Sequence, residues 1–114
     1  MLYLANGLSV HMLEFMCVGE FRELRIERIS LKEVRRMLRS NAFQSYFGHR
    51  ESVETLSRVL RVDVPYNRNI LRFLKGDVLI IATLCSRREW EQDPMDYQKY
   101  KFYLVEYLEN GKSD

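Results

Sequence analysis

His49 is the side chain best suited to acid–base chemistry near neutral pH, because an imidazole gives and takes protons in that range. It follows Gly48 and stands at the predicted start of a helix. Loops at strand ends commonly carry functional groups, and here such positions hold the polar residues Asn6, Ser9, Arg68, Arg87, Arg88, Glu89 and Glu91. Histidine, arginine and a carboxylate together suit cleavage of an RNA phosphodiester by its own 2′-hydroxyl.

In that reaction the enzyme aligns the nucleophile, neutralises the phosphate and protonates the leaving 5′-oxygen. His49 is the candidate general acid, Arg87 or Arg68 the candidate phosphate contact, and Glu89 or Glu91 the group that would orient the imidazole. A purely structural explanation stands beside this one. A histidine at a helix start is commonly a cap or a residue bordering the core, and the helix dipole disfavours an imidazolium there.

Several other chemistries are poorly supported. The glycines are isolated, so the sequence has no phosphate-binding loop of the P-loop or dinucleotide type, and it has no GxSxG stretch. Cys17 and Cys85 form neither a CxxC pair nor a zinc set with the two histidines. We therefore expect no metal site and no cofactor. A disulfide between the two cysteines remains an open alternative.

Length and composition indicate one globular domain over residues 1–114. Hydrophobic residues make up 46% and charged residues 30% of the 114 residues, and the net charge of +2 is too small to indicate a partner by itself. No apolar run approaches the roughly 20 residues that span a bilayer. We expect a cytoplasmic protein with no membrane partner.

The apolar pattern predicts about five strands. These are Leu2–Ala5, Glu23–Arg28, Ile70–Leu74, Val78–Leu84 and Phe102–Leu108, with the third and fourth forming a hairpin through Lys75-Gly76-Asp77. Loops are expected at 8–12 (or a short extended piece) and at 13–21. Residues 109–114 read as a frayed polar tail.

Two main helices are predicted. The first begins after the N-cap Ser30, with Glu33 completing a capping box. The second runs from about His49 to Leu60 and places His49 on the apolar stripe of Val53, where it would border the core. A short helix is expected from Asp93 to about Lys101. The fold class is α/β, a five-stranded mixed sheet with both main helices on one face, and we expect a second subunit or a ligand to cover the other face.

A family resemblance adds to this interpretation. The opening stretch Leu2–Leu13, the helix entry Ile29–Val34, the motif Phe47-Gly48-His49-Arg50-Glu51-Ser52 and the motif Val64-Pro65-Tyr66-Asn67-Arg68 together resemble the viral anti-CRISPR ring nucleases of archaeal viruses and some phages. The spacings from His49 to Arg68 and from Arg68 to Arg87 also fit that family without gaps. The similarity runs through nearly the whole chain.

The resemblance implies a homodimer that binds the second messenger cyclic tetra-adenylate and cuts it, without metal, into linear di-adenylates with 2′,3′-cyclic phosphate. This would block type III CRISPR defence in the cytoplasm of an infected host cell. By position, His49 is the general acid and Arg87 contacts the scissile phosphate. The ring-binding set is Asn6, Ser9, Arg68 and, more loosely, His11 and Arg88. We do not expect double-stranded nucleic acid as a partner.

The sequence departs from the family pattern at three places, one of which is His11, where the family usually has asparagine. Trp90 occupies the position of the glutamate that orients the histidine, so Glu89 or Glu91 would replace it. This departure keeps a non-catalytic binder of cyclic oligoadenylate as one alternative, and the arginines of the first helix keep a small DNA-binding regulator as another. The loop between Leu13 and Glu23 is longer than in the family, which suggests a lid over the ligand.

Overall fold

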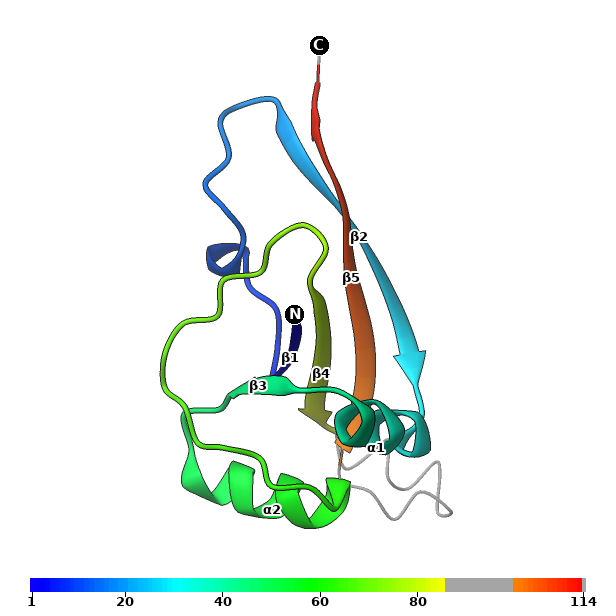
Figure 1. Ribbon diagram of the computed structural model, residues 1–114. Helices are drawn as coiled ribbons and strands as arrows, with labels where there is room; N and C mark the ends of the chain where they lie inside the picture. The colour runs from blue at the N-terminus through cyan, green and yellow to red at the C-terminus, as the bar shows by residue number, and fades with distance from the viewer. Residues whose placement is uncertain (86–99, 114) are drawn as a thin grey trace.

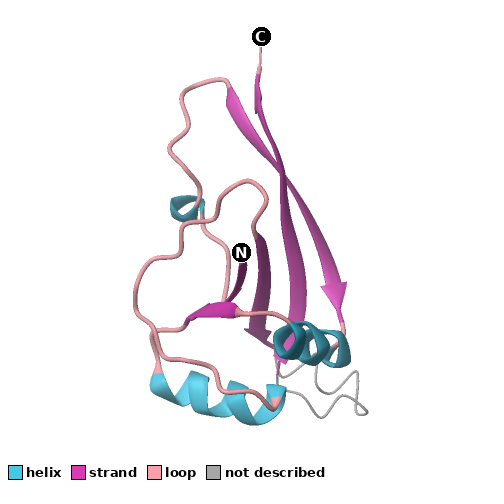
Figure 2. Cartoon of the chain, in the orientation of Figure 1, coloured by secondary structure: helices cyan, strands magenta, loops and turns pink. Residues whose placement is uncertain are grey.

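The computed structural model describes residues 1–85 and 100–113. Along this part of the chain the elements are β1 (Leu2–Ala5), η1 (Val10–Met12), β2 (Glu20–Ile29), α1 (Leu31–Ser40), β3 (Phe43–Tyr46), α2 (Arg50–Leu60), β4 (Val78–Leu84) and β5 (Tyr100–Lys112). Figures 1 and 2 show the strands as one sheet, with α1 and α2 at one end of the molecule. The predicted short helix at 93–101 lies outside the described residues except for Tyr100 and Lys101, which belong to β5.

The five strands form one mixed sheet in the order β2-β5-β4-β1-β3. β1 is parallel to both of its neighbours, with Leu4 opposite Ser45 of β3 and Ile80 of β4. β5 runs antiparallel to β4 and to β2. The predicted α/β class, with a five-stranded mixed sheet and two helices, is confirmed. The arrangement sends the carboxyl ends of β3, β1 and β4 to a common edge.

Both helices cover the same face of the sheet. The inward side chains Val34 and Leu38 of α1 and Leu56 and Leu60 of α2 are buried against Leu4 and other sheet residues. The predicted cap of α1 is present, because the Ser30 hydroxyl accepts a hydrogen bond of 3.1 Å from the Glu33 amide. The Glu33 carboxylate instead accepts from Arg36 at 3.0 Å, so only the Ser30 half of the capping box is observed.

The second face of the sheet is covered by two irregular segments of the same chain, so it does not depend on a second subunit or a ligand for cover. Leu71 and Phe73 are buried with Ala5, Leu79 and Val105, and residues of the 8–13 segment pack against the same cluster. The two segments are joined where the Phe73 amide donates to the Met12 carbonyl at 2.7 Å. This covering layer, residues 8–13 and 70–74, gives the protein a core on each side of the sheet.

The predicted hairpin between 70–74 and 78–84 is wrong. Residues 70–74 belong to no strand or helix. Leu71 and Phe73 are buried, but the segment pairs with no strand of the described chain. β4 pairs instead with β1 and β5, and the fifth strand is β3, which is not among the strands predicted from the sequence. The predicted turn before β4 is present. Gly76 has φ 89°, and the Asp77 carboxylate accepts from the Leu74 amide at 2.9 Å.

β2 and β5 extend beyond the rest of the sheet as a two-stranded ribbon (Figure 1). Residues 109–112, predicted as a frayed tail, belong to β5 and pair with the start of β2. Gly111 lies against the Phe21 ring, and a Cβ at this glycine would come within 1.9 Å of a ring carbon. The glycine therefore makes room for the aromatic ring between the two strands.

The loop before β2 lies at the far end of this ribbon. Glu20 pairs with Lys112, whereas β5 begins at Tyr100 on the helical side. Twelve strand residues at about 3.3 Å each place the loop roughly 40 Å from that edge of the sheet. Within one protomer the loop therefore does not act as a lid there.

Candidate functional site at the carboxyl edge of the parallel strands

A pocket lies where the parallel strands end. Its volume is about 210 Å³ and its lining residues are Asn6, Phe47, Ser52, Ala82, Thr83, Leu84 and Tyr100. They come from the ends of β1, β3 and β4, the first turn of α2 and the start of β5. In open α/β sheets this carboxyl edge is where ligands commonly bind.

His49 is the N-cap residue of α2. Its backbone is extended, at φ −125° and ψ 124°, and its side chain makes no capping hydrogen bond. The residue is exposed, so the prediction that it borders the core is wrong. The stripe that continues through Val53 and Leu56 begins inside the helix, whereas the extended backbone of the cap turns His49 outward. Its imidazole is therefore accessible to a ligand at the entrance of the helix.

A loop from the other end of α2 returns to this entrance. The Val64 amide donates to the Ser57 hydroxyl at 3.0 Å. Further along, the Asn67 amide donates to the Phe47 carbonyl at 3.1 Å. The hydroxyl of Ser45, a residue only 2% exposed, donates to the Pro65 carbonyl. These bonds hold residues 64–67, named the return loop below, against the segment that leads from β3 into His49.

The return loop brings Arg68 next to the histidine. A Cβ on Gly48 would lie 3.7 Å from the Arg68 Cγ, which is ordinary van der Waals contact. On the other side of His49, the Arg50 guanidinium carbon lies 4.7 Å from the centre of the Tyr66 ring. Residues 48–50 and 66–68 therefore contact each other, although about 18 positions separate the two segments in the sequence. Arg68 is exposed and can offer its planar fork to a phosphate beside His49.

The other predicted site residues fall into three groups. Asn6 lines the pocket. Ser9 and His11 are exposed on η1 and its N-cap, and Figure 1 shows that short helix well apart from the first turn of α2. The third group, Arg87, Arg88, Glu89 and Glu91, lies outside the described residues. Within the described chain, the structure therefore places Arg68 against Gly48, the residue before His49, whereas Asn6 lines the nearby pocket together with Ser52 of α2, the helix whose N-cap is His49.

Sequence reasoning missed several residues that build this site. Ser45 was not among the predicted site residues, yet its buried hydroxyl anchors the return loop. Tyr66 was the variable position of a motif, and nothing in the sequence indicated its contact with Arg50. Tyr100 lines the pocket, and burial raises the pKa of its phenol above the ordinary value of 10.0. Its hydroxyl therefore stays protonated and available as a hydrogen-bond donor.

Two further observations concern other ligands and the membrane. Within residues 1–85 and 100–113, the side chains of His, Cys, Asp and Glu form no group of three that could hold a metal ion. The same part of the chain contains no helix with the length and apolar content needed to cross a bilayer. Cys17 and Cys85 are not joined by a disulfide.

Taken together, the fold and the edge pocket define a small α/β protein with a pocket at the carboxyl ends of three parallel strands. The chain belongs to the STIV B116-like family, which it matches over residues 2–102.

Individual relatives agree with this assignment. The chain is 35% identical over 88 residues to "Uncharacterized protein ORF117" of Acidianus two-tailed virus, covering 75% of this chain and 71% of that one. It is 27% identical over 89 residues to "Uncharacterized protein YddF" of Bacillus subtilis (strain 168), covering 73% and 82%. Among solved structures, B116 of Sulfolobus turreted icosahedral virus has the same fold, with a TM-score of 0.69, 17% identity, and coverage of 93% and 98%. The family therefore includes proteins of archaeal viruses.

Proposed function

We propose that this protein is a metal-independent ring nuclease that degrades cyclic tetra-adenylate and so blocks type III CRISPR defence in the cytoplasm of an infected cell. The observation that carries the proposal is the contact of Arg68 with Gly48, the neighbour of the exposed His49, at the carboxyl edge of the parallel strands. A proton donor and a phosphate-binding cation side by side are the two groups that RNA transesterification most needs. The family resemblance of the same residues supplies the substrate.

The proposed reaction needs no water and no metal. A ribose 2′-oxygen attacks the adjacent phosphorus, and the bond from phosphorus to the 5′-oxygen breaks. The 2′-hydroxyl loses its proton to a base, and His49 gives a proton to the departing 5′-oxygen. Each cut produces a 2′,3′-cyclic phosphate and a 5′-hydroxyl. Two cuts on opposite sides of the ring release two linear di-adenylates.

Arg68 would neutralise charge on the ring phosphates, and Asn6 would bind the ring from the pocket side. Arg87 would contact the scissile phosphate. Glu89 or Glu91 would orient His49. These last assignments follow the resemblance. The roles of His49, Arg68 and Asn6 draw additional support from the Arg68 contact with Gly48 and from the place of Asn6 in the edge pocket.

The proposed reaction cleaves a symmetric ring at two opposite positions. A homodimer with one site in each protomer would present two equivalent sites to such a ring. The covering layer offers a surface for such a contact, because Val10 and Ile70 on its outer side are 72% and 77% exposed and Leu74 is 41% exposed. Ser9 and His11 flank Val10, so a two-fold contact here would place them at the boundary between subunits. Sedimentation velocity tests this: the wild type should sediment as a dimer and Ile70→Asp as a monomer.

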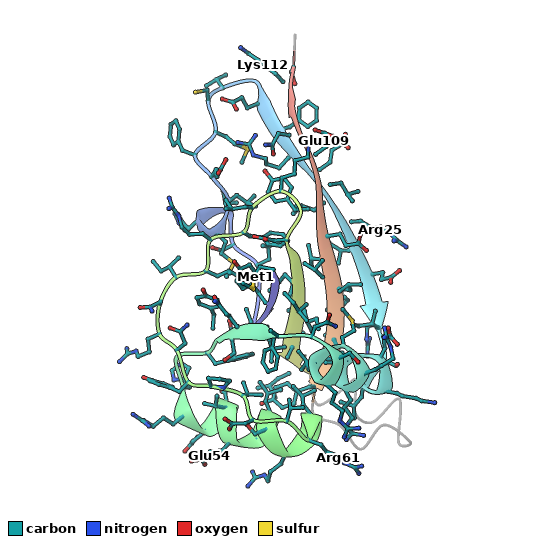
Figure 3. All side chains as sticks on the ribbon, in the orientation of Figure 1. Met1, Arg25, Glu54, Arg61, Glu109 and Lys112 are labelled. Carbon is teal, nitrogen blue, oxygen red and sulfur yellow. The ribbon has the colours of Figure 1, made fainter. Side chains whose placement is uncertain are left out.

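The activity test uses radiolabelled cyclic tetra-adenylate in EDTA. Wild-type protein should form di-adenylate with cyclic phosphate ends, and His49→Ala should be at least about 100-fold slower, since general acid catalysis contributes about that much or more. Glu54→Ala is the matched control, because Glu54 is an exposed residue of the same helix (Figure 3) and the change removes a side chain of comparable size. Full activity of His49→Ala would overturn the proposed mechanism.

The same experiment separates the main alternative, a non-catalytic binder that sequesters the ring. Such a protein would bind labelled ring tightly and release it unchanged. Arg68→Gln tests the binding step separately. It should weaken ring binding, whereas Arg58→Gln, which removes an exposed charge of α2, should not. Tight binding by wild type with no product would favour sequestration over cleavage.

A further inference from the structure

A second hollow, on the opposite end of α2 from His49, is lined almost entirely by cations. Its volume is about 400 Å³. Among the described residues its ionisable lining consists of Lys32, Arg35, Arg36, Arg39 and Arg61, with Glu33 as the one carboxylate. Four of the cations come from α1, and Arg61 comes from the residue that ends α2. Figure 3 shows Arg61 at that end of α2, beneath α1. We name this feature the cationic hollow.

Within residues 1–85 and 100–113, few carboxylates balance this charge. Arg36 is neutralised by Glu33, which accepts from its Nε at 3.0 Å. Arg35 donates from Nε and Nη2 to the Val59 carbonyl, at 3.1 and 2.7 Å. Its partner is a neutral carbonyl group, which does not neutralise its charge as a carboxylate would. Burial, together with the charges of Arg61 and Arg39, lowers the pKa of the Arg35 guanidinium below its ordinary value. Like charges are therefore crowded together, and an anion placed among them would relieve the repulsion.

The backbone conformation of Arg61 is a second indication that its charge is needed in the hollow. Among the described residues, Arg61 is the one non-glycine residue with a positive φ, at 57°. Glycine or asparagine is the usual residue at a left-handed helix terminus, and a long side chain there costs conformational free energy. An arginine at this position is explained if its guanidinium is needed in the hollow.

We propose that the cationic hollow is a binding site for an oligophosphate, a linear chain of two or more phosphoryl groups. Guanidinium groups bind phosphate oxygens in pairs, and convergence of cations from two helices on one hollow of this volume suits a compact ligand. Duplex DNA would instead require cations spread along an extended face. The arginines of β2 do not extend the hollow in that way, since Arg25, for example, is paired with Glu27 at 3.0 Å.

The test measures binding of inorganic tripolyphosphate by isothermal titration calorimetry at constant ionic strength. Wild-type protein should bind it, and Arg39→Gln/Arg61→Gly should bind at least about tenfold more weakly, because charge-assisted contacts are each worth about a factor of ten. Glycine at position 61 suits the left-handed backbone, so the variant should remain folded. The control is Arg58→Gln/Arg72→Gln, which removes two exposed arginines outside the hollow and should bind as the wild type does.

Three further ligands distinguish the sources of the signal. Binding of ATP comparable to tripolyphosphate indicates a nucleotide ligand, and tripolyphosphate binding alone indicates free polyphosphate; either supports an oligophosphate site. Sulfate is the control for simple charge. Equal affinity for sulfate and tripolyphosphate, unchanged affinity in the double variant, or stronger binding of duplex DNA than of tripolyphosphate would each overturn the proposal. The site is remote from His49, so both double variants should retain any activity on cyclic tetra-adenylate.

Discussion

Ser45→Ala tests whether the return loop is held in place by one buried hydroxyl. Ser45 is 2% exposed, and its side chain donates to the Pro65 carbonyl. Alanine removes the donor without a large change in volume and leaves the carbonyl without that partner. Loss of a buried hydrogen-bond partner costs about 1–3 kcal/mol. For a chain of this length the melting temperature should fall by about 4 °C for each kcal/mol.

The same substitution should affect the site, because Arg68 follows the return loop directly. Without the hydroxyl, the return loop should occupy its docked conformation for a smaller fraction of the time, and Arg68 is positioned for binding only in that conformation. The apparent affinity for the ring then falls in proportion to the population of the docked conformation. Ser45→Ala should therefore weaken binding of cyclic tetra-adenylate up to about tenfold. If the hydroxyl has only a local role, stability will fall and affinity will not.

Urea denaturation and ring-binding titrations measure the two effects on the same preparations. Ser40→Ala is the matched control, because Ser40 is an exposed residue at the end of α1. Its free energy of unfolding should stay within about 0.5 kcal/mol of the wild type, as is usual for surface substitutions. A Ser45→Ala protein that is equally unaffected would refute the reasoning that this hydroxyl fastens the loop.

Two further predictions concern the covering layer and the pH dependence. Phe73→Ala should lower the free energy of unfolding by about 3–5 kcal/mol although Phe73 lies outside any strand or helix, whereas Ile70→Ala, at a residue 77% exposed, should have little effect on denaturation; equal effects would contradict the inward alternation of this segment. Lys75, which donates a hydrogen bond of 3.0 Å, lowers the pKa of Glu109 below its ordinary value of 4.5. The contribution of this pair is therefore present above the unfolded pKa and is lost as the pH falls through the lowered folded value. Glu109→Gln should shrink the difference in urea midpoint between about pH 7 and about pH 3, and an unchanged difference would show that the pair does not contribute.

The sequence predicted the regular elements whose signals are local. The Ser30 cap marks the start of α1, and the apolar run 78–84 coincides with β4. The covering layer and β3 were mistaken because their pairing is decided at long range. In residues 43–46 and in residues 70–74, the alternation of side chains is compatible with a strand. The first segment becomes β3 because it pairs with β1, whereas the second has no such partner. Periodicity identifies a β-prone segment but not the strand it will join.

The site shows the same division. The motif around His49 and the one around Arg68 were visible in the sequence as separate stretches. A shared site was predicted only because the spacing between them fits the family that the sequence resembles. Their meeting depends on the Ser45 hydroxyl and on the Asn67 amide, which bonds to the Phe47 carbonyl. A serine and a backbone amide carry no sequence signal for such contacts. Exposure of His49 was missed for a related reason, since the helical stripe was extended one residue beyond the first helical residue, Arg50.

The central claim is most directly tested by analysing the products formed from cyclic tetra-adenylate in EDTA by wild-type and His49→Ala proteins under single-turnover conditions. The account predicts that wild-type protein converts the ring to di-adenylate carrying a 2′,3′-cyclic phosphate and that His49→Ala leaves the ring intact over the same time. An intact ring with wild-type protein, or the same product at the same rate from His49→Ala, would contradict it.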